Sequence, residues 1–518
     1  MRRILVLLAV LAISPALFAQ RAPSDDHQLT LETLFQAFSR TNNAAGMGLA
    51  QPAPGSKTQL AVFDQFGDYH LAQQGEADYG FRFGTLRYDS FNEKLFMRGA
   101  FHYTLHREKN RPWSDVMDPW FSIPYIYGSS VAKDYDTHEA GLSFDLYTAP
   151  LWDKLSFGIK TDYEVADISG MRDPRPRTGY LNYQLVPSVL LTLGNHHLGL
   201  DLGYGYKKEK LYGLTTIQSY PNLYYYKMTG LDHVDGAISA YSGFKRQFVG
   251  SRFLGDLSYG YQEGRLNLLV SGGVEYGYLN AYGDKMQQPG SYNWWKYNGQ
   301  ADATLKGASL VHHFRVEATY TDGGANELLQ ELVSSKDPET GATTETWETL
   351  YEYQNRYMLR KYEGSAAYRL LGGYSGKDYR WSVGVKAGMD GFVKLYYLPY
   401  SGFQSDALKV SLDGSVRLLA VKGHKVELQV CGTYRKALQT LLSLEEDNLY
   451  VQEVLLPDKA YYAKDYVSLD GALQWQFPLN LGKAGKANGY VRLDGTYLKA
   501  LPEGNLSRIQ LAVGLFTF

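Results

Sequence analysis

The sequence predicts an all-β protein, a transmembrane antiparallel up-and-down β-barrel of about 18 strands, with about 14 or 16 strands as alternatives. Three patterns carry this prediction. Apolar and polar residues alternate along many segments, several segments reach the roughly 9 residues that a tilted strand needs to cross a bilayer, and short connections are interleaved with long ones. An even number of antiparallel strands closes into a barrel without an unpaired edge.

The alternation is clearest in residues 408–418, 426–435 and 155–165, where one set of alternate positions is apolar and the other largely polar. A period of two is typical of a β-strand with one apolar and one hydrophilic face. A soluble β-sandwich shows the same period, but its strands average about 5 or 6 residues. The longer runs, and aromatic residues near strand ends such as Trp294 and Trp295, favour strands that cross a membrane and meet its interface with their rings.

Connections of two lengths separate the predicted strands. Short turns fall near residues 90–93, 193–196, 262–265, 306–308 and 422–424, and the longest loops near 110–137, 211–250, 322–350 and 441–464. We expect the short turns at the periplasmic rim and the long loops at the extracellular rim of the barrel. Residues 234–250 and 374–400 can be divided into strands in more than one way, which leaves the strand count open.

The composition of the 518-residue chain excludes several classes of protein. The net charge of −2 provides no basic field for nucleic acid, and a hydrophobic share of 44% is low for a bundle of membrane helices. The single cysteine, Cys431, rules out an internal disulfide. Because no serine-hydrolase elbow, zinc-protease pair or phosphate-binding loop occurs, we expect no enzyme, metal or cofactor. The alternative is a membrane-barrel hydrolase, whose catalytic groups come from different strands and form no local motif.

The first residues of the chain predict export. Residues 1–19 have the pattern of a cleaved signal peptide, since Arg2 and Arg3 precede an apolar run and cleavage is expected after Ala19. We expect residues 20–56 to form an N-terminal periplasmic or lumenal plug segment and residues 57–518 to form the barrel. A barrel exported in this way is a multi-pass protein of the cell outer membrane.

The carboxyl end of the chain is the most specific feature. The sequence stops at Phe518, with Phe516 two positions earlier. This end resembles the last strand of bacterial, Gram-negative outer-membrane β-barrel proteins, whose terminal aromatic residue is read by the barrel-assembly machinery. The resemblance implies that Phe516 and Phe518 form the membrane-assembly signal. Bulky residues at 509, 511, 513 and 515 fall on the opposite phase, which predicts a bulge in this strand.

Residues 35–49 resemble the Asn-Pro-Ala-type opening segment of barrels related to long-chain fatty-acid transporters, with Ala44 in place of the usual Pro. In that family the segment packs inside the lumen, which implies a lumenal plug here. An amphipathic periplasmic helix over residues 29–38 is the alternative. Taken whole, the chain most resembles an uncharacterised family of large Gram-negative outer-membrane barrels.

If the apolar strand faces meet lipid, the polar faces line the lumen. Alternate positions of four predicted strands then carry charges of both signs into the interior. These candidate lumen-lining residues are Lys160, Asp162, Glu164, Lys409, Asp413, Arg417, Lys425, Glu427, Arg435, Arg492 and Asp494. The mixed signs predict a wet lumen crossed by ion pairs, without selectivity for one sign of charge.

Two predicted loops carry candidate ligand-contacting residues. The aromatic candidates between residues 110 and 137 are Trp113, Trp120, Phe121, Tyr125 and Tyr127. These rings suit a constriction of the pore or a stacking surface for a solute, and self-packing of the loop is the alternative. Arg172, Arg175 and Arg177 place three guanidiniums close together, which suits contact with carboxylate or phosphate groups at the rim.

Together these features predict a passive channel or uptake protein for a small solute. Its expected partners are outer-membrane lipid, lipopolysaccharide and the barrel-assembly machinery, in addition to the solute itself, and nucleic acid is not among them. The alternative is a structural or partner-binding barrel of a surface or secretion assembly, with its lumen plugged by loops. A conducting pore and a plugged scaffold differ in whether the purified protein passes current.

Overall fold

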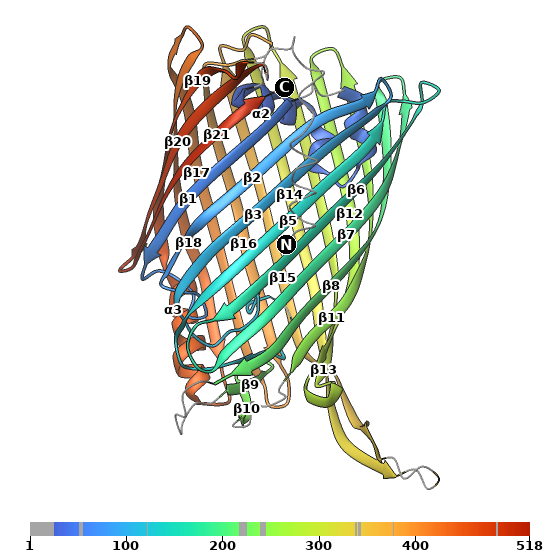
Figure 1. Ribbon diagram of the computed structural model, residues 1–518, viewed down its shortest axis with the longest axis vertical. Helices are drawn as coiled ribbons and strands as arrows, with labels where there is room; N and C mark the ends of the chain where they lie inside the picture. Colours follow the sequence, from blue (N-terminus) through green and yellow to red (C-terminus); the bar gives the residue numbers. More distant parts are fainter. Residues whose placement is uncertain are drawn as a thin grey trace.

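The computed structural model shows a closed, all-antiparallel β-barrel (Figure 1). It describes residues 25–50, 55–121, 123–216, 225–238, 245–336, 339, 343–376, 378–482 and 485–517. Within these ranges 18 strands form one sheet, which closes because β1 (Gly55–Gly67) pairs with β21 (Asn505–Thr517) as well as with β2 (Ala77–Asn92). The predicted fold class and strand number are confirmed, while the predicted signal peptide lies outside the described residues.

The other barrel strands are β3 (Leu95–Arg111), β5 (Lys133–Thr148), β6 (Leu155–Gly170), β7 (Arg175–Leu193), β8 (His196–Thr215), β11 (Arg246–Glu263), β12 (Leu266–Tyr282), β13 (Gly290–Lys306), β14 (Leu310–Lys336), β15 (Thr343–Gly372), β16 (Trp381–Tyr396), β17 (Ser401–Val421), β18 (His424–Ser443), β19 (Asp465–Asn480) and β20 (Lys486–Leu501). A small second sheet contains β4 (Tyr127–Gly128), β9 (Tyr225–Thr229) and β10 (His233–Ile238). The helical elements are α2 (Asp26–Phe35), η1 (Ala37–Arg40), η2 (Ala44–Ala50), η3 (Asp284–Met286), η4 (Val451–Leu455) and α3 (Leu456–Ala463).

In the described part of the chain, no helix is long and apolar enough to span a membrane.

The strands expose apolar side chains on the outside and bury polar ones on the inside. In β8, Leu202 is 59% exposed while its neighbour Asp201 is fully buried, and in β11 Leu257 is 67% exposed while Asp256 is 8% exposed. This is the reverse of a soluble protein, in which large apolar side chains are buried. The outer surface is therefore suited to lipid, and the alternation seen in the sequence places the polar positions in the lumen.

The two ends of the barrel have connections of different lengths. At one end, called here the short-turn end, β7 and β8 are joined by residues 194–195, β11 and β12 by 264–265, and β17 and β18 by 422–423. Gly194, Gly264 and Gly423 have positive φ angles there, which two-residue hairpin turns require. At the other end, called the long-loop end, the loops carry β4, β9, β10, η4 and α3.

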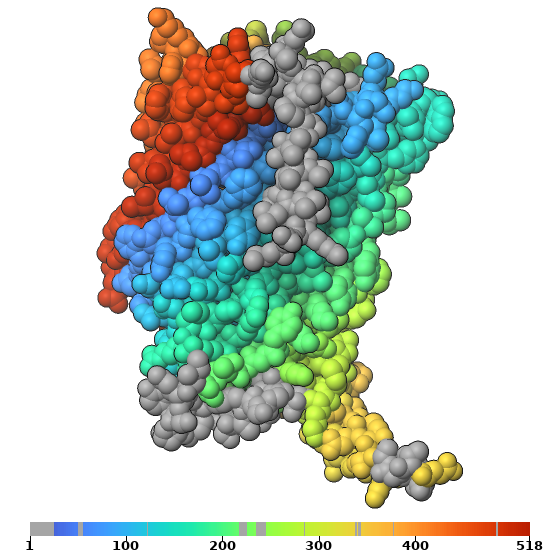
Figure 2. Space-filling view, viewed as in Figure 1, coloured from blue at the N-terminus to red at the C-terminus, as the bar shows by residue number. Residues whose placement is uncertain are grey.

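One predicted loop is a hairpin instead. Residues 322–350 were expected as a long loop, but β14 and β15 pair from the barrel out to Lys336 and Thr343. The two strands have 27 and 30 residues and project beyond the long-loop end, as the yellow segment in Figure 2 shows. The prediction was wrong because Thr, Trp and Tyr are frequent in residues 343–353, and those β-prone residues continue the pairing without needing a bilayer.

The predicted bulge in the last strand is also absent. β21 pairs with β1 and β20 without a register shift over residues 505–517. Ile509, Leu511 and Val513 are about half-exposed on the outer face, whereas Phe516 is fully buried on the inner face beside Tyr490. The bulky residues at odd positions therefore face outward, and Phe516 falls on the opposite phase because its ring points into the barrel. Phe518 lies outside the described residues.

Candidate functional site

Residues 25–50 pack inside the barrel at the short-turn end, and we call them the N-terminal segment. Leu31 and Leu34 of α2 pack in one cluster with Val311 and Leu371 of the inner face. Met47 of η2 packs in a second cluster, with Tyr88, Phe96 and Tyr147 of β2, β3 and β5, on the opposite side of the barrel. Figure 1 shows α2 beside the short turns, within the ring of strands. Apolar contacts thus join the segment to several sides of the lumen.

His27 is the centre of a buried ionic cluster between α2 and the barrel wall. Its Nδ1 atom lies 2.7 Å from a carboxylate oxygen of Asp378, in the turn before β16, and Nε2 contacts Glu427 of β18. Arg417 of β17 also contacts Asp378. Burial opposes the imidazolium, but the two carboxylate hydrogen bonds outweigh it and raise the pKa of His27 to about 9. His27 is therefore charged at neutral pH.

Further ion pairs attach the same segment around the barrel. Lys425 lies 2.6 Å from Asp25, the residue that caps α2, and Lys57 lies 2.9 Å from Asp26. On the other side of the lumen, Arg40 lies 2.8 Å from Asp302. These contacts involve β1, β13 and β18, so that the segment is held across the opening rather than along one wall.

At the long-loop end, three loops pack together in an apolar cluster. Trp113 is buried against the rings of Tyr226 and Tyr450, and its Nε1 donates to Glu453 in η4 at 2.7 Å. Tyr125 is buried too, and its hydroxyl donates to the backbone carbonyl of Asn326 at 2.6 Å. The cluster continues into inward-facing residues of β11 to β17. We call this region the mouth cluster.

The five aromatic residues that were predicted to form one constriction or stacking loop therefore lie in different places. Trp113 and Tyr125 belong to the mouth cluster, and Tyr127 pairs with β9 in the small sheet. Phe121 contacts Phe392 of the barrel wall edge-on and also lines a cavity below the loop. Trp120 is half-buried and lines none of the lumenal cavities described below.

A buried ionic group fastens two of these loops to the wall, and it was not predicted. Arg246 at the start of β11 lies 3.0 Å from Asp115 and 3.6 Å from Glu209, and each of the three is at most 3% exposed. The hydroxyl of Tyr225 also donates to Asp115. Nothing in the sequence connects these residues, because they lie up to 131 positions apart and no motif contains them.

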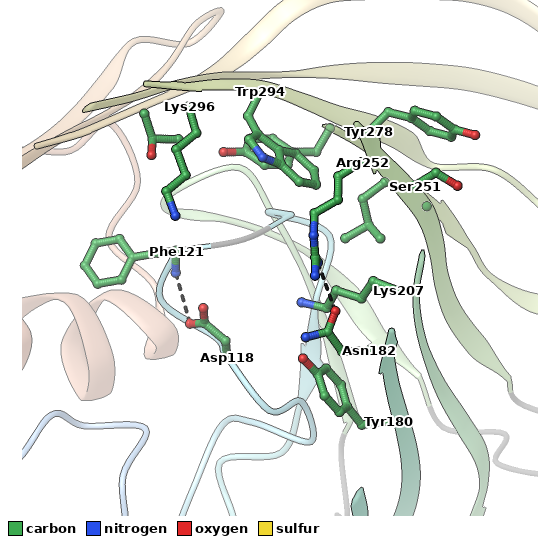
Figure 3. Close-up of a pocket in the computed structure, with 14 residues that line it drawn as sticks. Asp118, Phe121, Tyr180, Asn182, Lys207, Ser251, Arg252, Tyr278, Trp294 and Lys296 are labelled. Atoms are coloured by element: carbon green, nitrogen blue, oxygen red, sulfur yellow. Dashed lines mark hydrogen bonds between the residues drawn. The ribbon is translucent and has the colours of Figure 1, made fainter. Parts of the chain in front are cut away.

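A cavity of about 220 Å³ lies between the mouth cluster and the middle of the lumen (Figure 3). Its wall includes the cations Lys207, Arg252 and Lys296 and the ring of Trp294. The other lining residues used below are Asp118, Phe121, Tyr180, Asn182 and Tyr292. Figure 3 shows the charged ends of the three cations directed into the same space, with Asp118 on the opposite side. We call this space the cationic cavity.

The structure places Trp294 on the inner face of the barrel, not at the membrane interface where the sequence predicts it. Trp294 and Trp295 were both placed at the membrane interface, but only Trp295, 46% exposed, faces outward. Adjacent residues of a strand point to opposite faces, so Trp294 is directed inward, where its Nε1 donates to Glu275 at 2.9 Å. The same alternation rule, applied to β7, β8 and β11, would have found Tyr180, Lys207 and Arg252.

The predicted lumen-lining charges lie in different parts of the interior. Arg417, Lys425 and Glu427 contact the N-terminal segment or its neighbouring turn, whereas Arg435 donates to the carbonyl oxygen of Lys464 beside α3 at 2.6 Å. Asp413, Arg492 and Asp494 line a cavity of about 520 Å³ that also includes Cys431, and Lys160 lines one of about 440 Å³ beside Arg40. The other three on these inner faces are Asp162, Glu164 and Lys409. Lys409 pairs with Asp390 at 2.8 Å.

The predicted rim arginines lie at the long-loop end, in and beside the turn between β6 and β7. Arg175 pairs with Asp173 at 2.8 Å, and Arg177 pairs with Asp167 at 2.7 Å. Two of the three guanidiniums therefore bind carboxylates of the chain itself, while Arg172 is exposed. Among the residues that the structure describes, no group of three or more His, Cys, Asp or Glu side chains is arranged to hold a metal ion.

Comparison with known proteins identifies the family. The profile of a family of unknown function, DUF6850, matches residues 44–517. The chain belongs to this family. No curated protein matches the sequence.

Similar solved structures include the copper transporter OprC, at 7% identity and a TM-score of 0.38, covering 89% of this chain and 80% of that one. A FadL homologue of Pseudomonas aeruginosa is 10% identical, with a TM-score of 0.34 and coverage of 96% and 99%. OpdL of the same species is 11% identical, with a TM-score of 0.33 and coverage of 89% and 98%. A closed barrel with an apolar outer surface is the architecture of bacterial outer-membrane proteins.

Proposed function

We propose that the protein is an outer-membrane uptake barrel for a small solute, in which the N-terminal segment is a plug that gates the periplasmic end. The observation that carries this proposal is the position of residues 25–50 inside the short-turn end, where Asp26, Arg40 and His27 contact β1, β13 and β18. Short turns face the periplasm in barrels of this class. A solute that leaves the lumen toward the periplasm must therefore pass this segment.

Between the two packed ends, the lumen is polar and contains cavities. Two of them, of about 520 and 440 Å³, lie next to the plug and are lined by residues such as Thr30 and Arg40 of the plug itself. Solute-sized polar space beside a single segment docked in the lumen supports gated uptake rather than a permanently open passive channel. The structural or partner-binding barrel remains the competing function, and it requires the plug to stay in place.

Planar-bilayer conductance tests the proposal. We expect wild-type protein to pass little current, and a variant that lacks residues 25–50 to form stable single channels. The matched control is Lys285→Gln, which breaks an exposed ion pair with Glu345 on the projecting hairpin and should leave the current at the wild-type level. A heat-dependent shift on gels verifies that each variant forms a closed barrel. If the folded deletion variant passes no more current than wild type, the gating proposal is wrong and the structural function takes its place.

A further inference from the structure

We infer that the cationic cavity binds a small planar organic anion, of the size of one ring with one carboxylate, as the solute of this barrel. The inference rests on the proposed uptake function and names the substrate class. Its first support is the charge of the cavity wall. Lys207, Arg252 and Lys296 face Asp118 across the cavity, Glu275 lies 3.8 Å from Arg252, and Glu164 accepts a hydrogen bond from Asn182 of the lining at 3.4 Å. In the described part of the chain, only Glu275 lies within ion-pair distance of any of these three cations, so Lys207 and Lys296 are left to attract a small anion.

Two of the three cations make no ion pair with the residues that the structure describes. Throughout the described ranges, neither Lys207 nor Lys296 lies within ion-pair distance of a carboxylate. Asp118 Oδ1 accepts the backbone N–H groups of Trp120 at 3.0 Å and Phe121 at 3.2 Å, which fixes this carboxylate within its loop. Cations gathered in a partly enclosed space repel one another unless an anion joins them. A bound carboxylate supplies that anion.

Arg252 is held in position for such a ligand. Its guanidinium donates to Asn182 at 2.9 Å and to Gln184 at 2.9 and 3.2 Å, and both partners lie on the inner face of β7, on the far side of β8. Neutral amide oxygens orient the group without cancelling its charge. A guanidinium fixed in this way is suited to a planar carboxylate, which it recognises through parallel hydrogen bonds.

The rings of the cavity determine the shape of the ligand. Tyr292 and Trp294 are nearly parallel, with an interplanar angle of 21° and centroids 5.5 Å apart, while Phe121 and Tyr180 contribute further ring surface. Aromatic faces favour flat partners. The volume of about 220 Å³ is below the roughly 300–1,000 Å³ of pockets that hold drug-sized ligands, so a single ring is the appropriate size.

Equilibrium dialysis of the full-length, detergent-solubilised barrel against radiolabelled benzoate tests the inference, because long equilibration makes slow access to the lumen unimportant. We expect benzoate to bind and to be displaced poorly by benzamide, which is flat but neutral, and by cyclohexanecarboxylate, which is anionic but not flat. Lys296→Gln and Lys207→Gln should each weaken binding about ten-fold, as expected for one charge-assisted hydrogen bond. The matched control is Lys386→Gln, which removes an inward lysine from the 520 Å³ cavity and should leave benzoate binding unchanged.

The possible outcomes separate this inference from the proposed function. Absence of benzoate binding, or equal displacement by benzamide, overturns the anionic ligand class even if deletion of the plug produces current. Binding that is lost equally in Lys386→Gln overturns the assignment to this cavity. Benzoate binding without current in any folded variant supports the cavity and contradicts uptake. A heat-dependent gel shift again verifies that each variant is a folded barrel.

Discussion

Replacing His27 with alanine should release the plug, and the structure gives the size of the effect. The imidazole is 5% exposed, stacks on Tyr379 at a centroid distance of 4.0 Å and contacts two carboxylates. Each charge-assisted hydrogen bond contributes about 1.5 kcal/mol or more. Asp378 keeps Arg417 and Lys425 as partners, which reduces the loss at that residue. The plug should therefore be less firmly docked by about 2 to 3 kcal/mol, so that its undocked population rises roughly 30- to 150-fold.

Cysteine labelling measures this population. Met47, 2% exposed, is replaced by cysteine in a Cys431→Ser background, and the rate of maleimide labelling is compared with and without His27→Ala. When opening and closing are fast, that rate is proportional to the open fraction. The control is His196→Ala, which removes an exposed histidine from the outer face and should not change the rate. Equal labelling rates in the presence and absence of the His27→Ala substitution would refute the view that this ionic cluster holds the plug.

Two further predictions concern pH and the outer surface. Since the pKa of His27 is raised from 6.5 to about 9, its contribution to docking is complete below about pH 6.5 and is lost as the pH rises through about 9. Labelling of the Met47→Cys protein, corrected with a free cysteine peptide, should therefore accelerate between about pH 7 and 10, but not in the His27→Ala background. Leu257→Arg places a charge on the lipid face and should cost up to about 2–4 kcal/mol in urea unfolding from vesicles. Thr319→Arg, on the inner face, should cost much less, and equal losses would contradict the assigned faces.

The barrel could be predicted from the sequence because the two faces of each strand meet different environments, lipid and lumen, and carry different residue types. Leu408, Val410 and Leu412 are exposed on the outside while Lys409 pairs inside with Asp390, and this alternation is visible without knowing any partner strand. The projecting hairpin shows where the approach fails. Beyond the membrane both faces of β14 and β15 meet water, so apolar and polar residues need not alternate there, and the sequence pattern predicts a loop.

The site was less accessible to prediction because its contacts are distant in the sequence. The pattern placed Glu427 in the lumen but gave no reason to pair it with His27, 400 positions earlier. The aromatic loop was recognised, yet its division between the mouth cluster and the cationic cavity depends on the opposing walls. Trp294 was assigned to the wrong face because two adjacent tryptophans look alike in a sequence, while in a strand only one of them can meet lipid.

The two packed ends differ in how many segments must move to open them. The mouth cluster combines three loops, each anchored by a barrel strand on both sides. The buried group of Arg246, Glu209, Asp115 and Tyr225 fastens two of them to the wall. The plug is a single segment before β1, and several of its contacts are ion pairs such as Arg40 with Asp302. Removing one segment disrupts fewer independent attachments than removing three. We therefore expect the short-turn end to open first, with a solute held in the cationic cavity until the plug moves.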